Sequence, residues 1–268
     1  MRKRKPLSKN RLKRGIPLLP SLFTVGNLFC GYYSVIATLQ GKYAPAALAI
    51  GIAMVADGLD GRIARMTNSQ SAFGEALDSL ADVLTFGMAP AALMFSWALT
   101  DLERLGWMTA FFFLACSATR LARFNVQTGN QDHRYFVGLP APPAAAMLAS
   151  LAFYSPAPVN TEALSYGVVA MVALLSLLMI SKVRYRSFKN IDLSARRPHP
   201  LVALVAVVFA LIANAPQTVL LLMAAVYVAS GPGERLWTQF RRRRHEPDPA
   251  TVVDSDIEAP TDAADEPR

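Results

Sequence analysis

The sequence predicts an all-α fold, a polytopic integral membrane helical bundle of about eight transmembrane helices. Of its 268 residues, 53% are hydrophobic and only 17% are charged. The apolar residues come in blocks of about 15–24, separated by short polar links. A bilayer core of roughly 30 Å needs about 20 apolar residues per helix. Backbone groups in lipid must bond within their own segment, so repeated blocks of this length indicate helices.

Eight blocks meet this description, and the last two are short. We expect helices at residues 18–39, 44–61, 76–99, 106–124, 139–155, 163–181, 201–214 and 216–231. The tight link Asn214–Gln217 predicts that the last two form a C-terminal hairpin over 201–231, or alternatively one bent segment.

Three further regions complete the expected organisation. A basic arm, residues 1–16, precedes a membrane core at 17–200 with six helices. A tail at 232–268, first basic and then acidic and Pro-rich, follows the hairpin. Its low content of aromatic residues predicts disorder.

The basic residues predict the orientation in the membrane. With eight helices both termini lie on one side, and that side has 25 of the 27 Lys and Arg residues, against Lys42 and Arg104 on the other. Cytoplasmic loops are enriched in Lys and Arg, so we expect both termini and the link between the second and third helices in the cytoplasm. The net charge of +8 is explained by this topology. Basic clusters beside a membrane favour anionic lipid headgroups as partners, and we expect no nucleic acid.

Four aspartates flank the polar link after the second predicted helix. Asp57 and Asp60 are three residues apart at the end of the 44–61 helix, whereas Asp78 and Asp82 are four apart at the start of the 76–99 helix. Each pair therefore shares a helix face, and the short link makes the two helices antiparallel neighbours. Carboxylates in a partly dry site repel one another, so a positive partner is needed. Mg²⁺ or Mn²⁺ fits such oxygen ligands, with room for two ions.

Solvated helix ends are the alternative for these aspartates, but polar groups in membrane spans are costly and favour a functional interpretation. Small residues interrupt the same segment at Gly58, Gly61, Ala64 and Gly74. They leave space for a ligand or another helix. Arg65 adds a bidentate donor suited to phosphate oxygens. The combination predicts a substrate with a metal-bound diphosphate.

The stretch "DGLDGRIAR", followed after eight residues by "GEALDSLAD", resembles the signature of the CDP-alcohol phosphatidyltransferases at every fixed position. The stretches "PSLFTVGNLFCGYYSVIA", "FGMAPA", "TRLARFNVQ" and "YFVGLPAPPAAA" are similar to the bacterial phosphatidylserine synthase branch of that family. The resemblance covers roughly residues 17–230, and only Ser21 and Pro143 depart from the branch pattern.

The resemblance implies an enzyme that transfers the phosphatidyl group of CDP-diacylglycerol to the hydroxyl of L-serine and releases CMP. It implies a homodimer in the bacterial inner membrane, with two divalent cations, Mg²⁺ or Mn²⁺, at each active site. Asp82 would be both a metal ligand and the general base. The other implied metal ligands are Asp57, Asp60 and Asp78. The residues implied to shape the CDP pocket are Gly61, Ala64, Arg65 and Gly74.

Serine or phosphate binding is expected at Arg120, Arg123 and Asn125, near the cytoplasmic end of the 106–124 helix. Arginine forks suit a carboxylate, although these arginines also serve as topology markers. Another acceptor with the same chemistry (glycerol phosphate, inositol, inositol phosphate or choline) is the first alternative. A divalent-cation transporter is a remote one, because transporters usually place such sites at the bilayer midplane.

Overall fold

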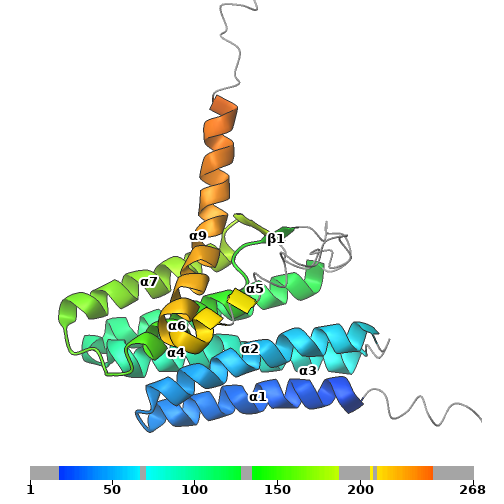
Figure 1. Cartoon of the computed structure of the whole chain (residues 1–268), viewed down its shortest axis with the longest axis horizontal. Coiled ribbons are helices and arrows are strands. Elements are labelled where there is room, and N and C mark those ends of the chain that lie inside the picture. Colours follow the sequence, from blue (N-terminus) through cyan, green and yellow to red (C-terminus); the bar gives the residue numbers. More distant parts are fainter. Residues whose placement is uncertain (1–17, 67–70, 128–134, 187–205, 208–209, 244–268) are drawn as a thin grey trace, which may run out of the picture. The chain divides into compact units, whose positions relative to one another are not determined.

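The structure is a computed structural model and describes residues 18–66, 71–127, 135–186, 206–207 and 210–243. The bundle discussed below is the compact unit that ends at Gly231. Its first helices are α1 (Leu18–Leu39), α2 (Tyr43–Met66) and α3 (Ala72–Asp82) (Figure 1). The chain continues through η2 (Val83–Met88), α4 (Ala89–Met94), η3 (Phe95–Leu99), η4 (Thr100–Leu102) and α5 (Glu103–Gln127). The remaining elements are β1 (Tyr135–Val137), α6 (Ala141–Tyr154), α7 (Glu162–Ile180), β2 (Arg184–Arg186) and α9 (Pro216–Arg243).

The prediction of an all-α membrane bundle is confirmed, and two three-residue strands add to it. The stretches long and apolar enough to cross a membrane are Leu22–Leu39, Tyr43–Ile63, Phe73–Val126 and Glu162–Ile180. The third has 54 residues and contains two of the predicted helices, 76–99 and 106–124. Glu103, between them, has a φ of 43°. The predicted 201–214 helix lies largely outside the described residues, so the count of eight stays a prediction.

The faces of α1 show how an apolar sequence forms this bundle. Large side chains such as Leu22, Phe29 and Tyr32 are exposed, as expected of a surface that contacts lipid. The opposite face packs along α2 and against α3 and η2. The residues on this face are spaced three or four apart and are small or polar. They are Thr24, Asn27, Gly31, Ser34 and Thr38. Small residues let helices approach closely in a membrane, where burial of apolar area gives no driving force.

A change of helical pitch follows α3. The π-helical segment η2 begins directly after Asp82, and Pro90 lies at the start of the α-helical segment that comes next. Proline has no N–H to complete the α-helical hydrogen bonds of the preceding turn, and an inserted π-turn is one way to accommodate that gap. Asp82 is therefore the last residue before the pitch changes.

The two short strands connect distant parts of the chain. β1 pairs antiparallel with β2, placing Val137 opposite Arg184. Gly138 then turns the chain into α6 with φ of +85°, and its N–H donates to the Val183 carbonyl at 2.8 Å. A side chain here would meet the Met179 carbonyl, so both the backbone angle and the available space favour glycine.

Tyr185 in β2 anchors α9 to the bundle. Its side chain is buried, its ring lies 6.0 Å from the ring of Tyr227 between centroids, and its hydroxyl donates to the Val228 carbonyl at 3.3 Å. Burial raises the pKa of Tyr185, so the hydroxyl keeps the proton that it donates.

The end of α9 corrects one prediction. We expected a disordered tail from residue 232, but the helix continues to Arg243 with Pro232 inside it. The expectation is therefore wrong for residues 232–243. Arg, which occurs four times in that stretch, is a good helix former, as are Leu236 and Gln239, and these residues favour the helix despite the polar composition. The predicted disorder of 244–268 lies outside the described residues.

Candidate functional site

Three aspartate side chains converge between the C-terminal half of α2 and the end of α3. Asp57, Asp78 and Asp82 are each half-buried, and one carboxylate oxygen from each lies within 4.8 Å of the others. Both helices pack against α1, and their aspartate oxygens meet across the gap between them. The start of α3 is set by Ser71, whose Oγ accepts from the Gly74 N–H at 3.1 Å. This cap places Asp78 and Asp82 one turn apart, at the end of α3.

The remaining residues of the predicted motif lie in the same two helices. Asp60, Ala64 and Arg65 are in α2, but their side chains lie outside the described part of the structure. A side chain added at Gly58 or Gly61 would have none of the described residues within 4 Å, so this part of the structure leaves space beside Asp57. Gly74, expected in the CDP pocket, also has a local role through its hydrogen bond to Ser71.

Asn27 of α1 is a site residue that the sequence analysis missed. Its side chain is 1% exposed, and its Nδ2 donates to Asp82 Oδ1 at 3.3 Å. Thr85 Oγ1 donates to the Asn27 carbonyl at 3.1 Å, which ties η2 to the same turn of α1. The signal was present in the sequence, because an Asn inside an apolar span is costly and usually has a purpose.

Arg120 of α5 faces the acidic cluster. Its guanidinium interacts electrostatically with Asp82 and with Tyr227 of α9, which the sequence analysis also missed. Its Nε is buried and has no hydrogen-bond partner among the described residues. Since buried donors are nearly always paired in native proteins, this nitrogen is suited to an anionic ligand.

The other two residues of the predicted acceptor site differ from Arg120. Arg123 is exposed on α5. Asn125 donates from Nδ2 to Ser79 Oγ at 2.9 Å, which links the end of α5 to α3. The structure therefore brings Arg120 to the acidic cluster, whereas Asn125 bonds to the helix that holds two of the aspartates.

The donor set fits a hard divalent cation. Among the side chains that the structure describes, three carboxylates and the Arg120 guanidinium leave the site with excess negative charge, which is unfavourable without a cation. Opposite oxygen ligands of one such ion are separated by about 4–5 Å, and the three aspartate oxygens all lie within 4.8 Å of one another. Oxygen-only ligands favour Mg²⁺ or Mn²⁺ over metals that prefer nitrogen or sulfur.

Comparison with known proteins agrees with this chemistry. The sequence model of one protein family, CDP-alcohol phosphatidyltransferase, matches residues 17–181. The chain is 34% identical over 218 residues to a CDP-diacylglycerol–serine O-phosphatidyltransferase of Helicobacter pylori, which covers 80% of this chain and 89% of that protein. It is 36% identical over 175 residues to the Bacillus subtilis protein of the same name, covering 64% and 92%. It is also 35% identical over 169 residues to an archaetidylserine synthase of Methanothermobacter thermautotrophicus, covering 62% and 69%. The family match includes every predicted site residue and ends before α9.

Proposed function

The chain belongs to the CDP-alcohol phosphatidyltransferase family, and from this premise we propose that it is a CDP-diacylglycerol–serine O-phosphatidyltransferase. It transfers the phosphatidyl group of CDP-diacylglycerol to the hydroxyl of L-serine, giving phosphatidylserine and CMP. One observation carries the proposal: the carboxylate oxygens of Asp57 in α2 and of Asp78 and Asp82 in α3 converge within 4.8 Å of one another. The names of the relatives described above support serine as the acceptor.

Asp57, Asp60, Asp78 and Asp82 would hold one or two divalent cations, Mg²⁺ or Mn²⁺. When bound, a divalent cation neutralises the diphosphate and stabilises negative charge that develops on its oxygens. Gly61, Ala64, Arg65 and Gly74 contribute to the CDP pocket. The space beside Gly58 and Gly61 supports this role, because a bulky group can approach the α2 backbone there.

Asp82 acts as the general base. The serine hydroxyl attacks the phosphorus that bears the diacylglycerol, its proton passes to Asp82, and the bond between that phosphorus and the CMP oxygen breaks. The hydrogen bond from Asn27 orients the Asp82 carboxylate for this transfer. Positioned acid–base groups contribute typically 10²–10⁴-fold to a rate.

Arg120, with Arg123 and Asn125 nearby on α5, binds the anionic groups of the reactants. The unpaired Nε of Arg120 supports a hydrogen bond to the serine carboxylate or to a donor phosphate. Arg123 is exposed and is suited to meet serine as it arrives from water.

The chain is a membrane protein with several apolar helices. We place it in a bacterial inner membrane as a homodimer, with the termini and the acidic cluster facing the cytoplasm. The charge distribution supports this orientation, since 25 of the 27 Lys and Arg residues fall on the cytoplasmic side. A lipid diphosphate and soluble serine meet at that boundary.

The test is CMP release by the purified protein in mixed micelles with CDP-diacylglycerol, Mg²⁺ or Mn²⁺, and one alcohol at a time. Serine should give rapid release, and EDTA should abolish it until Mg²⁺ or Mn²⁺ is restored. Release with glycerol phosphate, inositol, inositol phosphate or choline but not with serine would move the assignment to another acceptor. No release with any alcohol would refute the transferase proposal.

A further inference from the structure

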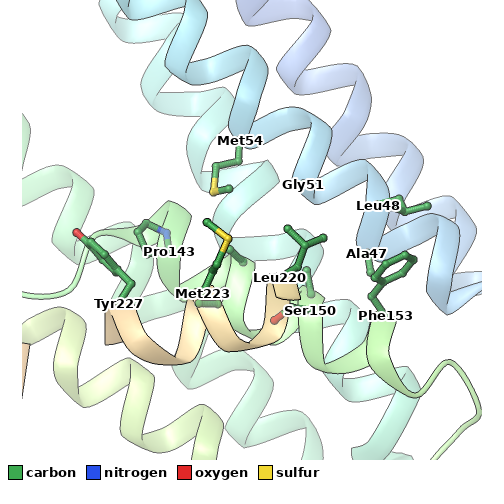
Figure 2. Close-up of a pocket in the computed structure, with 13 residues that line it drawn as sticks. Ala47, Leu48, Gly51, Met54, Pro143, Ser150, Phe153, Leu220, Met223 and Tyr227 are labelled. Atoms are coloured by element: carbon green, nitrogen blue, oxygen red, sulfur yellow. The ribbon is translucent and has the colours of Figure 1, made fainter. Parts of the chain in front are cut away.

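Tyr227 of α9 has no role in the function proposed above, although it interacts with Arg120. It is half-buried and lines a cavity of about 240 Å³ between α2, α6 and α9 (Figure 2). Figure 2 shows its ring near Pro143, with the hydroxyl directed away from α9. Because the packing around the ring is incomplete toward the cavity, other contacts are needed to fix its position.

Tyr185 of β2 provides this support. Its side chain is 1% exposed, and its ring stacks on that of Tyr227 with the centroids 6.0 Å apart and the planes inclined by 26°. The Tyr185 hydroxyl donates to the Val228 carbonyl, and a side chain at Gly231 would meet the Tyr185 ring. Aromatic pairs at this separation attract each other beyond the area that they bury. The strand pair of β1 and β2 therefore holds one turn of α9 in place.

That turn presents Tyr227 to Arg120 of α5, which also interacts with Asp82. A phenol oxygen accepts hydrogen bonds, whereas a guanidinium only donates them. A tyrosine can therefore hold an arginine without cancelling its positive charge, as a carboxylate would. The Arg120 Nε is buried and has no hydrogen-bond partner among the described residues, which suits it to an anionic ligand.

We propose that Tyr227 is a positioning residue for Arg120, so that α9 and the strand pair complete the site for an anionic group of a reactant, the serine carboxylate or a donor phosphate. The inference rests on the proposed function, which assigns that anion to Arg120. Tyr227 fixes the guanidinium and keeps its Nε available to the ligand. A helix that lies beyond the family match thus supports a residue within it.

Tyr227→Phe tests the proposal, because it keeps the ring that stacks on Tyr185 and removes only the hydroxyl. Tyr166→Phe on α7 is the matched control, since Tyr166 is 54% exposed and does not line the cavity. The measurements are kcat, KM for serine and KM for CDP-diacylglycerol, all from CMP release.

Tyr227→Phe should raise one of the two KM values on the order of tenfold, the effect of weakening a hydrogen bond to a charged group. A raised serine KM identifies the carboxylate as the ligand of Arg120, and a raised donor KM identifies the phosphate. Tyr166→Phe should change neither. If Tyr227→Phe leaves both KM values unchanged, or lowers kcat alone, the proposal is wrong.

A double variant separates positioning from general support of the fold. Residues that act through one another are not additive. In an Arg120→Lys background the guanidinium is absent, so adding Tyr227→Phe should leave the affected KM nearly unchanged. The same tenfold rise in that background would show that Tyr227 acts independently of Arg120.

Another readout depends on neither turnover nor the acceptor. In protein with isotope-labelled arginine, the Nε–H signal that disappears from the NMR spectrum of Arg120→Lys belongs to Arg120. Its exchange with deuterium should be slow in the unaltered protein and in Tyr166→Phe, and roughly tenfold faster in Tyr227→Phe. Equal exchange rates in the two variants would contradict the proposal. If the exchange rates differ as expected but serine releases no CMP, the serine transferase proposal fails while the positioning role of Tyr227 stands.

Discussion

Asp82 is constrained from several sides by residues of other helices. Asn27 of α1 donates to its Oδ1, Arg120 of α5 faces it, and Asp57 and Asp78 share the site with it. These contacts, in addition to its position in the motif, support the proposed role of Asp82 as the base.

Asp82→Asn should separate base catalysis from donor binding. The amide keeps the shape of the side chain, and its oxygen still accepts the Asn27 hydrogen bond, so the variant should fold and bind CDP-diacylglycerol. It has no carboxylate to take the serine proton, so kcat should fall about 10²–10⁴-fold. CMP release and donor binding are measured across a range of Mg²⁺ concentrations.

Two outcomes would contradict the base assignment. One is full turnover in Asp82→Asn. The other is recovery of turnover at high Mg²⁺, which would reduce Asp82 to a metal ligand.

Among the elements, α1 and η2 approach each other too closely to admit a side chain at Gly31. A side chain at Gly31 would meet the Thr85 hydroxyl, which bonds to the Asn27 carbonyl. The same turn of α1 therefore packs against η2 and presents Asn27 to Asp82. The geometry of the acidic cluster depends on this close approach.

Gly31→Ala should consequently reduce stability and activity together. Overpacking of this kind costs about 1–3 kcal/mol, and it moves Thr85 and Asn27 relative to Asp82. Gly26→Ala on the same helix is the matched control, because its added methyl group meets nothing within 4 Å. The control should be neutral or more stable by up to about 1 kcal/mol.

Both effects are measurable by thermal unfolding in detergent, followed with a thiol-reactive dye that reaches buried Cys116 only on unfolding. Serine-dependent CMP release is measured in parallel. Equal unfolding temperatures for the two variants would show that α1 and η2 are less tightly coupled than the structure indicates.

At the scale of the whole molecule, the orientation in the membrane determines which reactants can reach the acidic cluster. The acidic cluster lies between the C-terminal half of α2 and the end of α3, and the link between these helices is on the side predicted to contain 25 of the 27 basic residues. Serine and CMP are soluble. The acidic cluster must therefore open to the compartment that supplies serine and receives CMP. A cytoplasmic cluster meets this requirement.

Single cysteines in a protein without Cys30 and Cys116 should report this orientation. Lys42→Cys lies in the link before α2, and Met66→Cys lies at the exposed end of α2. In intact cells, a membrane-impermeant maleimide should label Lys42→Cys at once, and Met66→Cys only after the membrane is permeabilised. The reverse pattern would place the acidic cluster outside and exclude the proposed orientation.

The acidic motif and the membrane helices were readable from the sequence because both depend on local spacing. Helical repeats of three and four residues place Asp78 and Asp82 on one face wherever the helix lies, and the length of each apolar block follows from bilayer thickness. Local composition was misleading at residues 232–243. It predicted disorder there, but the helix continues to Arg243.

Only the tertiary structure decided which distant residues join the aspartates. Asn27, Arg120 and Tyr227 belong to three helices far apart along the chain, and they converge on the region of Asp82 through the packing of α1, α5 and α9. The cavity likewise exists only where α2, α6 and α9 meet. Sequence spacing constrains contacts within one helix, whereas contacts between helices depend on how closely their small residues allow them to pack.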